Sequence, residues 1–137
     1  MSERIMKAAL FVERDGRILL CRRREGSQLL ILPGGKLEEG ETAEEALKRE
    51  LMEELGDVEV AGLYRVGRYE GRAAGEMRKR VVIELFGGEL RGEARACAEV
   101  GELVWHGAGD DEARLAPSLR ESILPDLRAR GLLPGKG

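Results

Sequence analysis

Residues 34–57, GGKLEEGETAEEALKRELMEELGD, contain the features that decide the fold. A turn that contains Gly34, Gly35 and Gly40 leads into residues 41–55, which include no Gly or Pro. Thr42 and Glu45 fit the capping-box pattern, in which each side chain satisfies a backbone N–H of the other at a helix start. Apolar residues recur in a helical stripe, namely Ala43, Leu47, Leu51 and Leu55. The stretch therefore predicts a helix over residues 43–55 that ends at Gly56.

Three carboxylates on this helix differ in their position relative to the apolar stripe. At roughly 100° per residue, Glu54 lies about 40° from the centre of the stripe, Glu50 about 80° and Glu53 about 140°. Acids at this spacing repel one another, and each close pair costs roughly 0.2–0.5 kcal/mol. A solvated acidic face is the ordinary explanation for a Glu-rich helix. It fits poorly here, because Glu54 and Glu50 turn toward the buried side and need compensating cations.

A divalent metal ion would supply more positive charge than the neighbouring Lys48 and Arg49. Carboxylate oxygens are hard ligands, which suit Mg²⁺ or Mn²⁺ better than Zn²⁺. The sequence therefore predicts Mg²⁺, or Mn²⁺ in its place, beside this helix.

The spacing of these residues resembles the Nudix box. The matching positions are Gly35, Glu41, Arg49, Glu50, Leu51, Glu53, Glu54 and Gly56. Pro33 and Gly34 also resemble the usual approach to the box, whereas Asp57 stands where an aliphatic residue is common. The resemblance implies a single domain over residues 1–137. It also implies an α+β fold, a three-layer α/β/α sandwich around a mixed sheet, which agrees with the strands and helices expected from the sequence.

The resemblance also implies an activity, the hydrolysis of a nucleoside diphosphate linked to another group. Water would attack phosphorus while metal ions neutralise the phosphate oxygens and orient the water. Arg49 and Glu41 match positions that orient the acids through salt bridges. The implied metal ligands are Glu50, Glu53, Glu54 and the backbone carbonyl of Gly35.

The general base stays open between two kinds of residue. Some branches of the family use a glutamate of the box, here Glu53 or Glu54. Others use a glutamate on a later loop. Glu99 is the best candidate for this role because it lies six residues before Trp105 in the sequence, a spacing that resembles such family members. An exposed loop acid is an equal explanation for Glu99, and Glu102 is a weaker alternative.

Cations outside the box are candidates for binding the substrate phosphates. Alternation along a strand puts Arg22 and Arg24 on one face and Arg23 on the other. An ordinary polar strand end explains them as well. The same two explanations, phosphate binding and an ordinary polar residue, apply to Lys36. His106 has no evident partner and is expected to be an incidental surface residue.

Composition limits the remaining possibilities. A chain of 137 residues with 42% hydrophobic residues suits one soluble domain. The net charge of −3 favours neither nucleic-acid nor membrane binding. Cys21 and Cys97 form no metal or disulfide pattern, and no signal peptide is evident, so we expect reduced thiols in the cytoplasm. A homodimer is a possible assembly.

The rest of the chain reads as strands followed by a second helix. Expected strands or extended runs are 5–13, 17–23, 29–32, 58–68, 80–86 and 103–105, with the first two joined at Asp15-Gly16. Expected irregular segments are 70–78, a break at Gly87-Gly88, 89–98 and a frayed tail at 131–137. The second helix covers 118–130 and should be kinked or divided at Pro125.

The substrate is narrowed only by elimination. Family members that hydrolyse ADP-ribose tend to have a proline beyond the box, and this chain has none between Pro33 and Pro117. Signatures associated with NADH and coenzyme A hydrolases are absent, and Tyr69 is not at the spacing expected for diadenosine polyphosphates. A (d)NTP or oxidised (d)NTP remains the favoured substrate. The aromatic residues, expected mainly in the core, are Phe11, Tyr64, Tyr69, Phe86 and Trp105.

Other functions stay as alternatives. A catalytically silent nucleotide sensor would commonly have lost box acids, and this chain keeps them. An ADP-sugar or ADP-ribose pyrophosphatase is a further alternative. An isomerase on the same fold would need additional catalytic residues, and a purely structural domain would not need the box.

Overall fold

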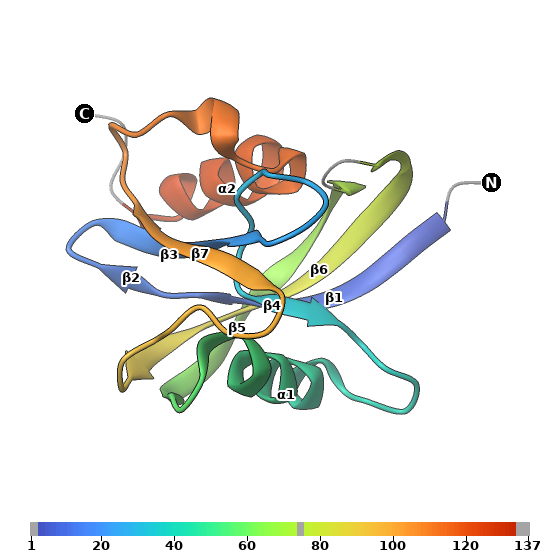
Figure 1. The fold of residues 1–137 in the computed structure, drawn as a ribbon. Coiled ribbons are helices and arrows are strands. Elements are labelled where there is room, and N and C mark those ends of the chain that lie inside the picture. The colour runs from blue at the N-terminus through green and yellow to red at the C-terminus, as the bar shows by residue number, and fades with distance from the viewer. Residues whose placement is uncertain (1–2, 74–75, 134–137) are drawn as a thin grey trace.

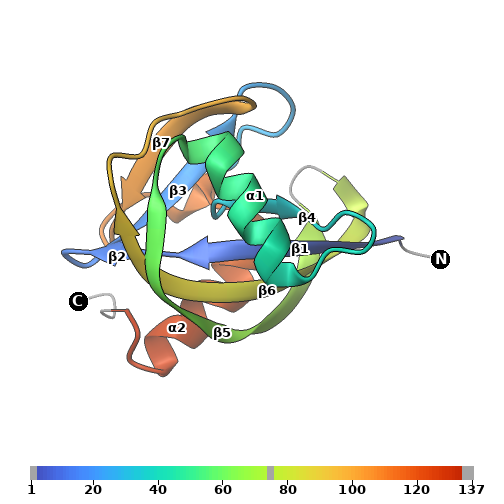
Figure 2. The same cartoon turned by 90° about the horizontal axis from the view of Figure 1, so that it is seen from below.

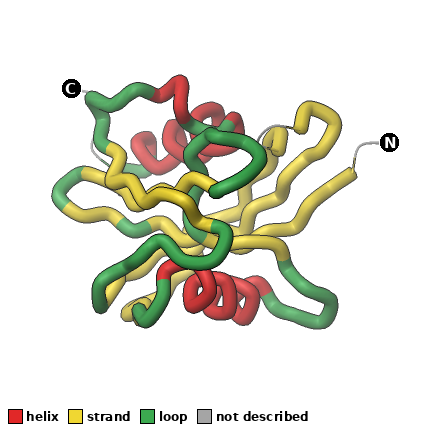
Figure 3. Tube along the Cα trace, viewed as in Figure 1, coloured by secondary structure: helices red, strands yellow, loops and turns green. Residues whose placement is uncertain are grey.

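The computed structural model describes residues 3–73 and 76–133, which form two sheets between two helical layers (Figures 1 and 3). One sheet contains β1 (Glu3–Phe11), β4 (Gly34–Lys36), β5 (Glu59–Ala73) and β6 (Glu76–Arg91). The other contains β2 (Glu13–Arg14), β3 (Arg17–Arg23) and β7 (Val100–His106). The strand orders are β4-β1-β6-β5 and β2-β3-β7.

The first sheet is mixed, because β1 runs parallel to β6 whereas its other neighbouring pairs are antiparallel. Helix α1 (Ala43–Leu55) covers one side of the molecule, as Figure 2 also shows. The helical turns η2 (Leu119–Ile123) and α2 (Leu124–Ala129) cover the opposite side. A short turn, η1 (Glu112–Arg114), precedes them. The expected α+β fold, with helices on both sides of a mixed sheet, is confirmed.

Strand β1 lies between two hydrophobic cores. Ala8 and Leu10 pack in the core under α1, whereas Ala9 and Phe11 pack in the core under α2. A strand buried on both faces reads as a continuous apolar run, which is what residues 8–12 show. Within residues 3–73 and 76–133, every helix is too short or too polar to cross a bilayer.

The strand expected over 5–13 is divided between the two sheets. Strand β1 ends at Phe11, and β2 then pairs with β3 in the other sheet. The turn at Asp15-Gly16 is confirmed, with φ of 53° and 79°, the positive values that a two-residue hairpin turn requires. The apolar run 29–32 forms only isolated bridges, one between Cys21 and Ile31 and one between Leu30 and Leu115.

The largest error in the sequence prediction concerns β5 and β6, which are much longer than expected. The predicted loop 70–78 is wrong where it is described, because β5 continues to Ala73 and β6 begins at Glu76; residues 74–75 lie outside the described residues. Likewise, β6 passes through Gly87-Gly88 and shortens the loop expected over 89–98.

Gly87 and Gly88 make room for the neighbouring strand instead of ending β6. A Cβ at Gly87 would lie 2.4 Å from the Tyr64 ring, and one at Gly88 would lie 2.5 Å from Val60. Tyr64 therefore lies over the sheet and stays 47% exposed, whereas Phe11 and Phe86 are buried as expected.

The terminal helix is confirmed and divided near Pro125. Residues Leu119–Ile123 form a π-helical turn in which the Leu124 N–H donates to the Leu119 carbonyl, and α2 follows. Proline has no N–H to donate, so a change in the backbone pattern next to it is expected. Strand β7 is longer than the predicted 103–105. Of the expected tail, residues 134–137 lie outside the described residues.

Two residues of α1 test how far packing of its apolar face supports the fold. Leu47 is fully buried, whereas Met52 on the same helix is 71% exposed. Leu47→Ala is expected to lower the free energy of unfolding by about 2–5 kcal/mol. Met52→Ala should change it by about 0.5 kcal/mol or less. Urea denaturation measures both, and equal losses would show that α1 is not held by this core.

Candidate active site

The acids are positioned by a helix whose first turn is capped as the sequence predicts. Thr42 Oγ1 accepts from the Glu45 N–H at 3.1 Å, and Glu45 Oε1 accepts from the Thr42 N–H at 2.9 Å. Both halves of the capping box are therefore present. The helix buries Ala46, Leu47, Leu51 and Leu55. With start and rotation fixed in this way, Glu50 and Glu54 face β4.

Gly34 lets β4 approach β1 closely, and Gly35 lets Glu50 of α1 approach β4. The two glycines pair with Ala9 and Ala8 of β1. Gly34 has a φ of 140°, and a Cβ there would lie 2.0 Å from the Ala8 carbonyl oxygen. A Cβ at Gly35 would lie 2.4 Å from the carboxyl carbon of Glu50. The carboxylate of Glu50 thus occupies the space that any larger residue at position 35 would fill.

Glu54 is half-buried, as Glu50 is, whereas Glu53 is exposed. Oε1 of Glu54 accepts a hydrogen bond from the Gly34 N–H at 3.0 Å. Burial raises the pKa of Glu54 to about 7, although the Gly34 hydrogen bond opposes the shift. The charge of Glu50 raises it further. A carboxyl in this position is therefore poorly compensated by the protein alone.

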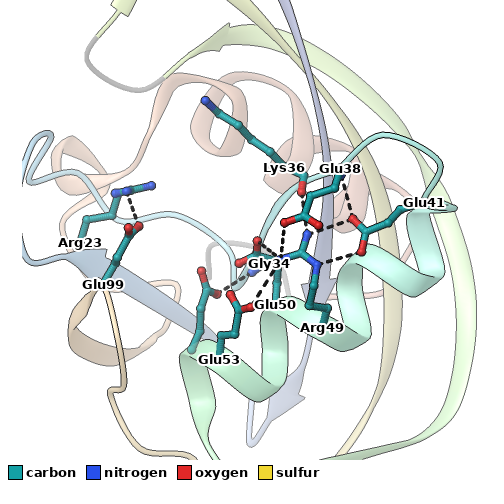
Figure 4. Close-up of polar contacts among 10 residues, drawn as sticks. Arg23, Gly34, Lys36, Glu38, Glu41, Arg49, Glu50, Glu53 and Glu99 are labelled. Atoms are coloured by element: carbon teal, nitrogen blue, oxygen red, sulfur yellow. Dashed lines mark hydrogen bonds and ion pairs between the residues drawn. The ribbon is translucent and has the colours of Figure 1, made fainter.

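Arg49 connects the acids to the segment before the helix (Figure 4). Its Nε and Nη2 donate to the two carboxylate oxygens of Glu41 at 2.8 and 3.0 Å. Its Nη1 donates to Glu50 at 2.8 Å. Hydrogen bonds from Arg49, then from the Glu38 N–H, lower the pKa of Glu41 to about 2. The guanidinium also lies 3.7 Å from Glu53.

A cavity of about 270 Å³ brings most of the predicted residues together. Its lining includes glycines, acids and cations from five separate segments of the chain: Lys7, Arg23, Gly34, Gly35, Lys36, Glu50, Glu54 and Glu99. Glu53 is not among the lining residues and is 55% exposed next to Arg49. Among the described residues, no aromatic side chain lines this cavity.

Glu99 reaches the cavity because its loop is hydrogen-bonded to the last turn of α1. The N–H groups of Arg95 and Cys97 donate to the carbonyls of Leu55 and Glu54, each at 3.0 Å. The loop therefore satisfies orphan carbonyls at the helix C-terminus. Arg23 then donates to Glu99 Oε2 at 2.6 Å, on the far side of the cavity from Arg49 (Figure 4).

Arg22 and Arg23 point in different directions, as strand alternation predicts. A register shift between them accompanies this difference. Arg23 lines the cavity, whereas Arg22 donates to Glu102 at 3.2 Å and to Gln28 at 2.9 Å. Glu102, the weaker candidate for a base, is therefore engaged outside the cavity.

The prediction that His106 is a surface residue is wrong. Its side chain is 4% exposed, and burial lowers its pKa. It lies at the end of β7 beside Ile18, Leu124 and Arg128, so the terminal helix covers it. In the described part of the chain, its Nε2 has no hydrogen-bond partner.

Sequence reasoning missed two residues of the cavity, Lys7 and Cys21. Lys7 could have been noticed as the one charge inside the apolar run IMKAALF. Cys21 gives no such signal; burial raises the pKa of its thiol to about 12. Both cysteines are free, as expected.

In this structure the three acids are engaged by protein groups. Glu50 and Glu53 face Arg49, and Glu54 accepts from Gly34. Accordingly, the described residues include no group of three Asp, Glu, His or Cys side chains arranged to hold a metal ion.

Comparison with known proteins gives matches along most of the chain. A family model described as NUDIX domain matches residues 4–126. An 8-oxo-dGTP diphosphatase from Haemophilus influenzae is 45% identical over 76 residues, 51% of this chain and 56% of that protein. The match therefore spans little more than half of that relative's length.

Solved structures agree with this family. The Escherichia coli ORF135 protein has 31% identity and a TM-score of 0.70, with 94% of each chain covered. A MutT NUDIX hydrolase from Burkholderia pseudomallei has 26% identity and a TM-score of 0.71, covering 83% of this chain and 91% of that one. A family model that covers most of the sequence, together with these structures, shows that the chain belongs to the Nudix family.

Proposed function

We propose that this chain hydrolyses a nucleoside diphosphate linked to another group, and that its substrate is a (d)NTP or an oxidised (d)NTP. The observation that carries the proposal is the pair of carboxylates, Glu50 and Glu54, held against Gly34-Gly35 in a cavity lined by cations. The 8-oxo-dGTP diphosphatase activity of the Haemophilus influenzae relative supports this substrate class.

The chemistry of the acids fits a divalent metal ion, although no three of the described acids are arranged around a common point in this structure. Burial raises the pKa of Glu54, and the charge of Glu50 raises it further, so a divalent cation beside the two carboxylates would stabilise their ionised forms. All the oxygens offered are carboxylate or carbonyl oxygens, which suit Mg²⁺ or Mn²⁺. We assign Glu50, Glu53, Glu54 and the Gly35 carbonyl as ligands. When bound, the metal would neutralise phosphate oxygens and orient the attacking water.

Arg49 and Glu41 act as positioning residues in this proposal. The bidentate hydrogen bonds from Arg49 to Glu41 fix the plane of the guanidinium, which also donates to Glu50 and holds it in place. Such paired hydrogen bonds between arginine and carboxylate give defined geometry as well as energy. Arg23 and Lys36, which line the same cavity, are proposed to bind substrate phosphates.

The acid assignment is tested by removing two carboxylates together. The variant Glu53→Gln with Glu54→Gln should lose about 100-fold or more in kcat, because it removes charge that would stabilise the transferring phosphoryl group through the metal. Formation of the nucleoside monophosphate, which every member of the panel would release, is measured by chromatography with Mg²⁺ over (d)NTPs, 8-oxo-dGTP, ADP-ribose and ADP-sugars.

The control removes the same charge from exposed positions, with Glu39→Gln and Glu44→Gln, and should behave as wild type. An active double variant at 53 and 54 would overturn the metal assignment. A wild type that hydrolyses nothing in the panel would instead favour a nucleotide sensor. Preference for ADP-ribose would replace the proposed substrate class.

The general base is proposed to be Glu99, because it lines the cavity opposite Glu50 and Glu54. Glu99→Gln should lower kcat by about 10²–10⁴-fold while the KM changes little. Steady-state kinetics on the best substrate measure this, with Glu102→Gln as the matched control because Glu102 pairs with Arg22 and Arg114 outside the cavity. Near-normal kcat in Glu99→Gln would assign the base to a glutamate of the box.

A further inference from the structure

Lys7 lies where two cavities meet. It lines the cavity of the acids, and it also lines a narrower neighbouring cavity of mainly apolar residues. That second cavity is formed by β1 and β6 against the terminal helical layer, with Ala9, Ile83, Leu119 and Ile123 in its wall. Its lining includes no charged side chain other than Lys7 in the described part of the chain.

The ammonium of Lys7 is poorly compensated within the protein. For the described residues, the structure gives Lys7 Nζ no hydrogen bond or ion pair, although it is more enclosed than the other cations of the site. Burial lowers its pKa, and the nearby charges of Arg23 and Lys36 lower it further, whereas the charge of Glu54 opposes the shift without cancelling it. Arg23, in contrast, has Glu99 as a partner. A buried ammonium without a partner is unfavourable unless a ligand supplies negative charge.

The register of the sheet directs Lys7 toward the same space as Lys36. The two residues are directly paired between β1 and β4, and directly opposed residues of an antiparallel pair project on the same face. Lys36 and Arg23 line only the cavity of the acids, whereas Lys7 lines both. Of these three cations, Lys7 is the one at the boundary between the polar and the apolar cavity.

A nucleotide has the same change in polarity along its length. Its phosphate chain is anionic, and its sugar and base are largely uncharged. If the phosphates lie with the acids, as the proposed function requires, the nucleoside lies over the mouth of the apolar cavity, whose volume of about 40 Å³ is too small to enclose it. The phosphate attached to the nucleoside then lies at the boundary, next to Lys7.

We propose that Lys7 is a substrate-binding residue whose Nζ donates to an oxygen of the phosphate attached to the nucleoside. This contact rests on the proposed function and adds to it a fixed direction for the substrate. It holds the nucleoside end of the diphosphate on β1, away from α1. Because the contact is to phosphate, it contributes equally whichever base the substrate carries.

The test compares two ligands that differ in whether they contain this phosphate. A nucleoside 5′-monophosphate contains it, whereas inorganic pyrophosphate has no nucleoside. Lys7→Met should weaken inhibition by the monophosphate and raise the substrate KM, each by about 10–100-fold. Inhibition by pyrophosphate should change by about threefold or less. Lys7→Arg, which keeps the charge, should recover part of the loss.

Lys48→Met is the matched control, because Lys48 is an exposed lysine that pairs with Glu44 at 3.4 Å on α1. It should leave all three constants unchanged. Circular dichroism checks folding, and Lys7→Gln replaces the methionine variant if that variant does not fold.

Three results would overturn the assignment of Lys7. These are wild-type constants in Lys7→Met, equal weakening of monophosphate and pyrophosphate, and a loss that differs between purine and pyrimidine monophosphates. The last would place Lys7 against the base. These results are distinct from failure of the proposed function, in which the wild type itself hydrolyses no nucleotide.

Discussion

The close contact between α1 and β4 is the constraint on which the site depends. Because Gly35 has no side chain, the carboxylate of Glu50 reaches β4, and Glu54 accepts a hydrogen bond from the Gly34 N–H beside it. The apolar face of α1 holds the helix in the core, and the capping box fixes where the helix begins. Burial of leucines on one side thereby determines where negative charge accumulates on the other.

Some charged side chains at the site are neutralised by protein partners and others are not, and this difference bears on what the site can bind. Arg49 compensates Glu41 and Glu50 through short hydrogen bonds. Glu54 accepts a hydrogen bond from the Gly34 N–H and is partly removed from water, which the charges of Arg23 and Lys7 offset only in part. Lys7 lines the same cavity and, among the described residues, has no hydrogen bond or ion pair to an anion, although the charge of Glu54 partly offsets its burial. An acid that needs a cation and a cation that needs an anion suit a metal and a phosphate between them.

Features set by residues close in sequence could be predicted. Features that depend on contacts with residues far along the chain could not. Helix α1, its cap and the positions of Glu50 and Glu54 follow from periodicity and from residues close in sequence. The length of β6 does not, because Gly87-Gly88 signals a break unless one knows that Tyr64 and Val60 lie over it. Lys7 and His106 were misjudged for the same reason: their environments come from distant strands and from the terminal helix.

The loop after β6 attaches Glu99 to the same end of α1 that carries Glu54. Its backbone is hydrogen-bonded to the carbonyls of Glu54 and Leu55 just before it delivers Glu99. A small displacement of the end of α1 would therefore carry Glu99 in the same direction as Glu54. Their separation would vary less than the position of either residue, so the width of the cavity would be preserved while its walls fluctuate.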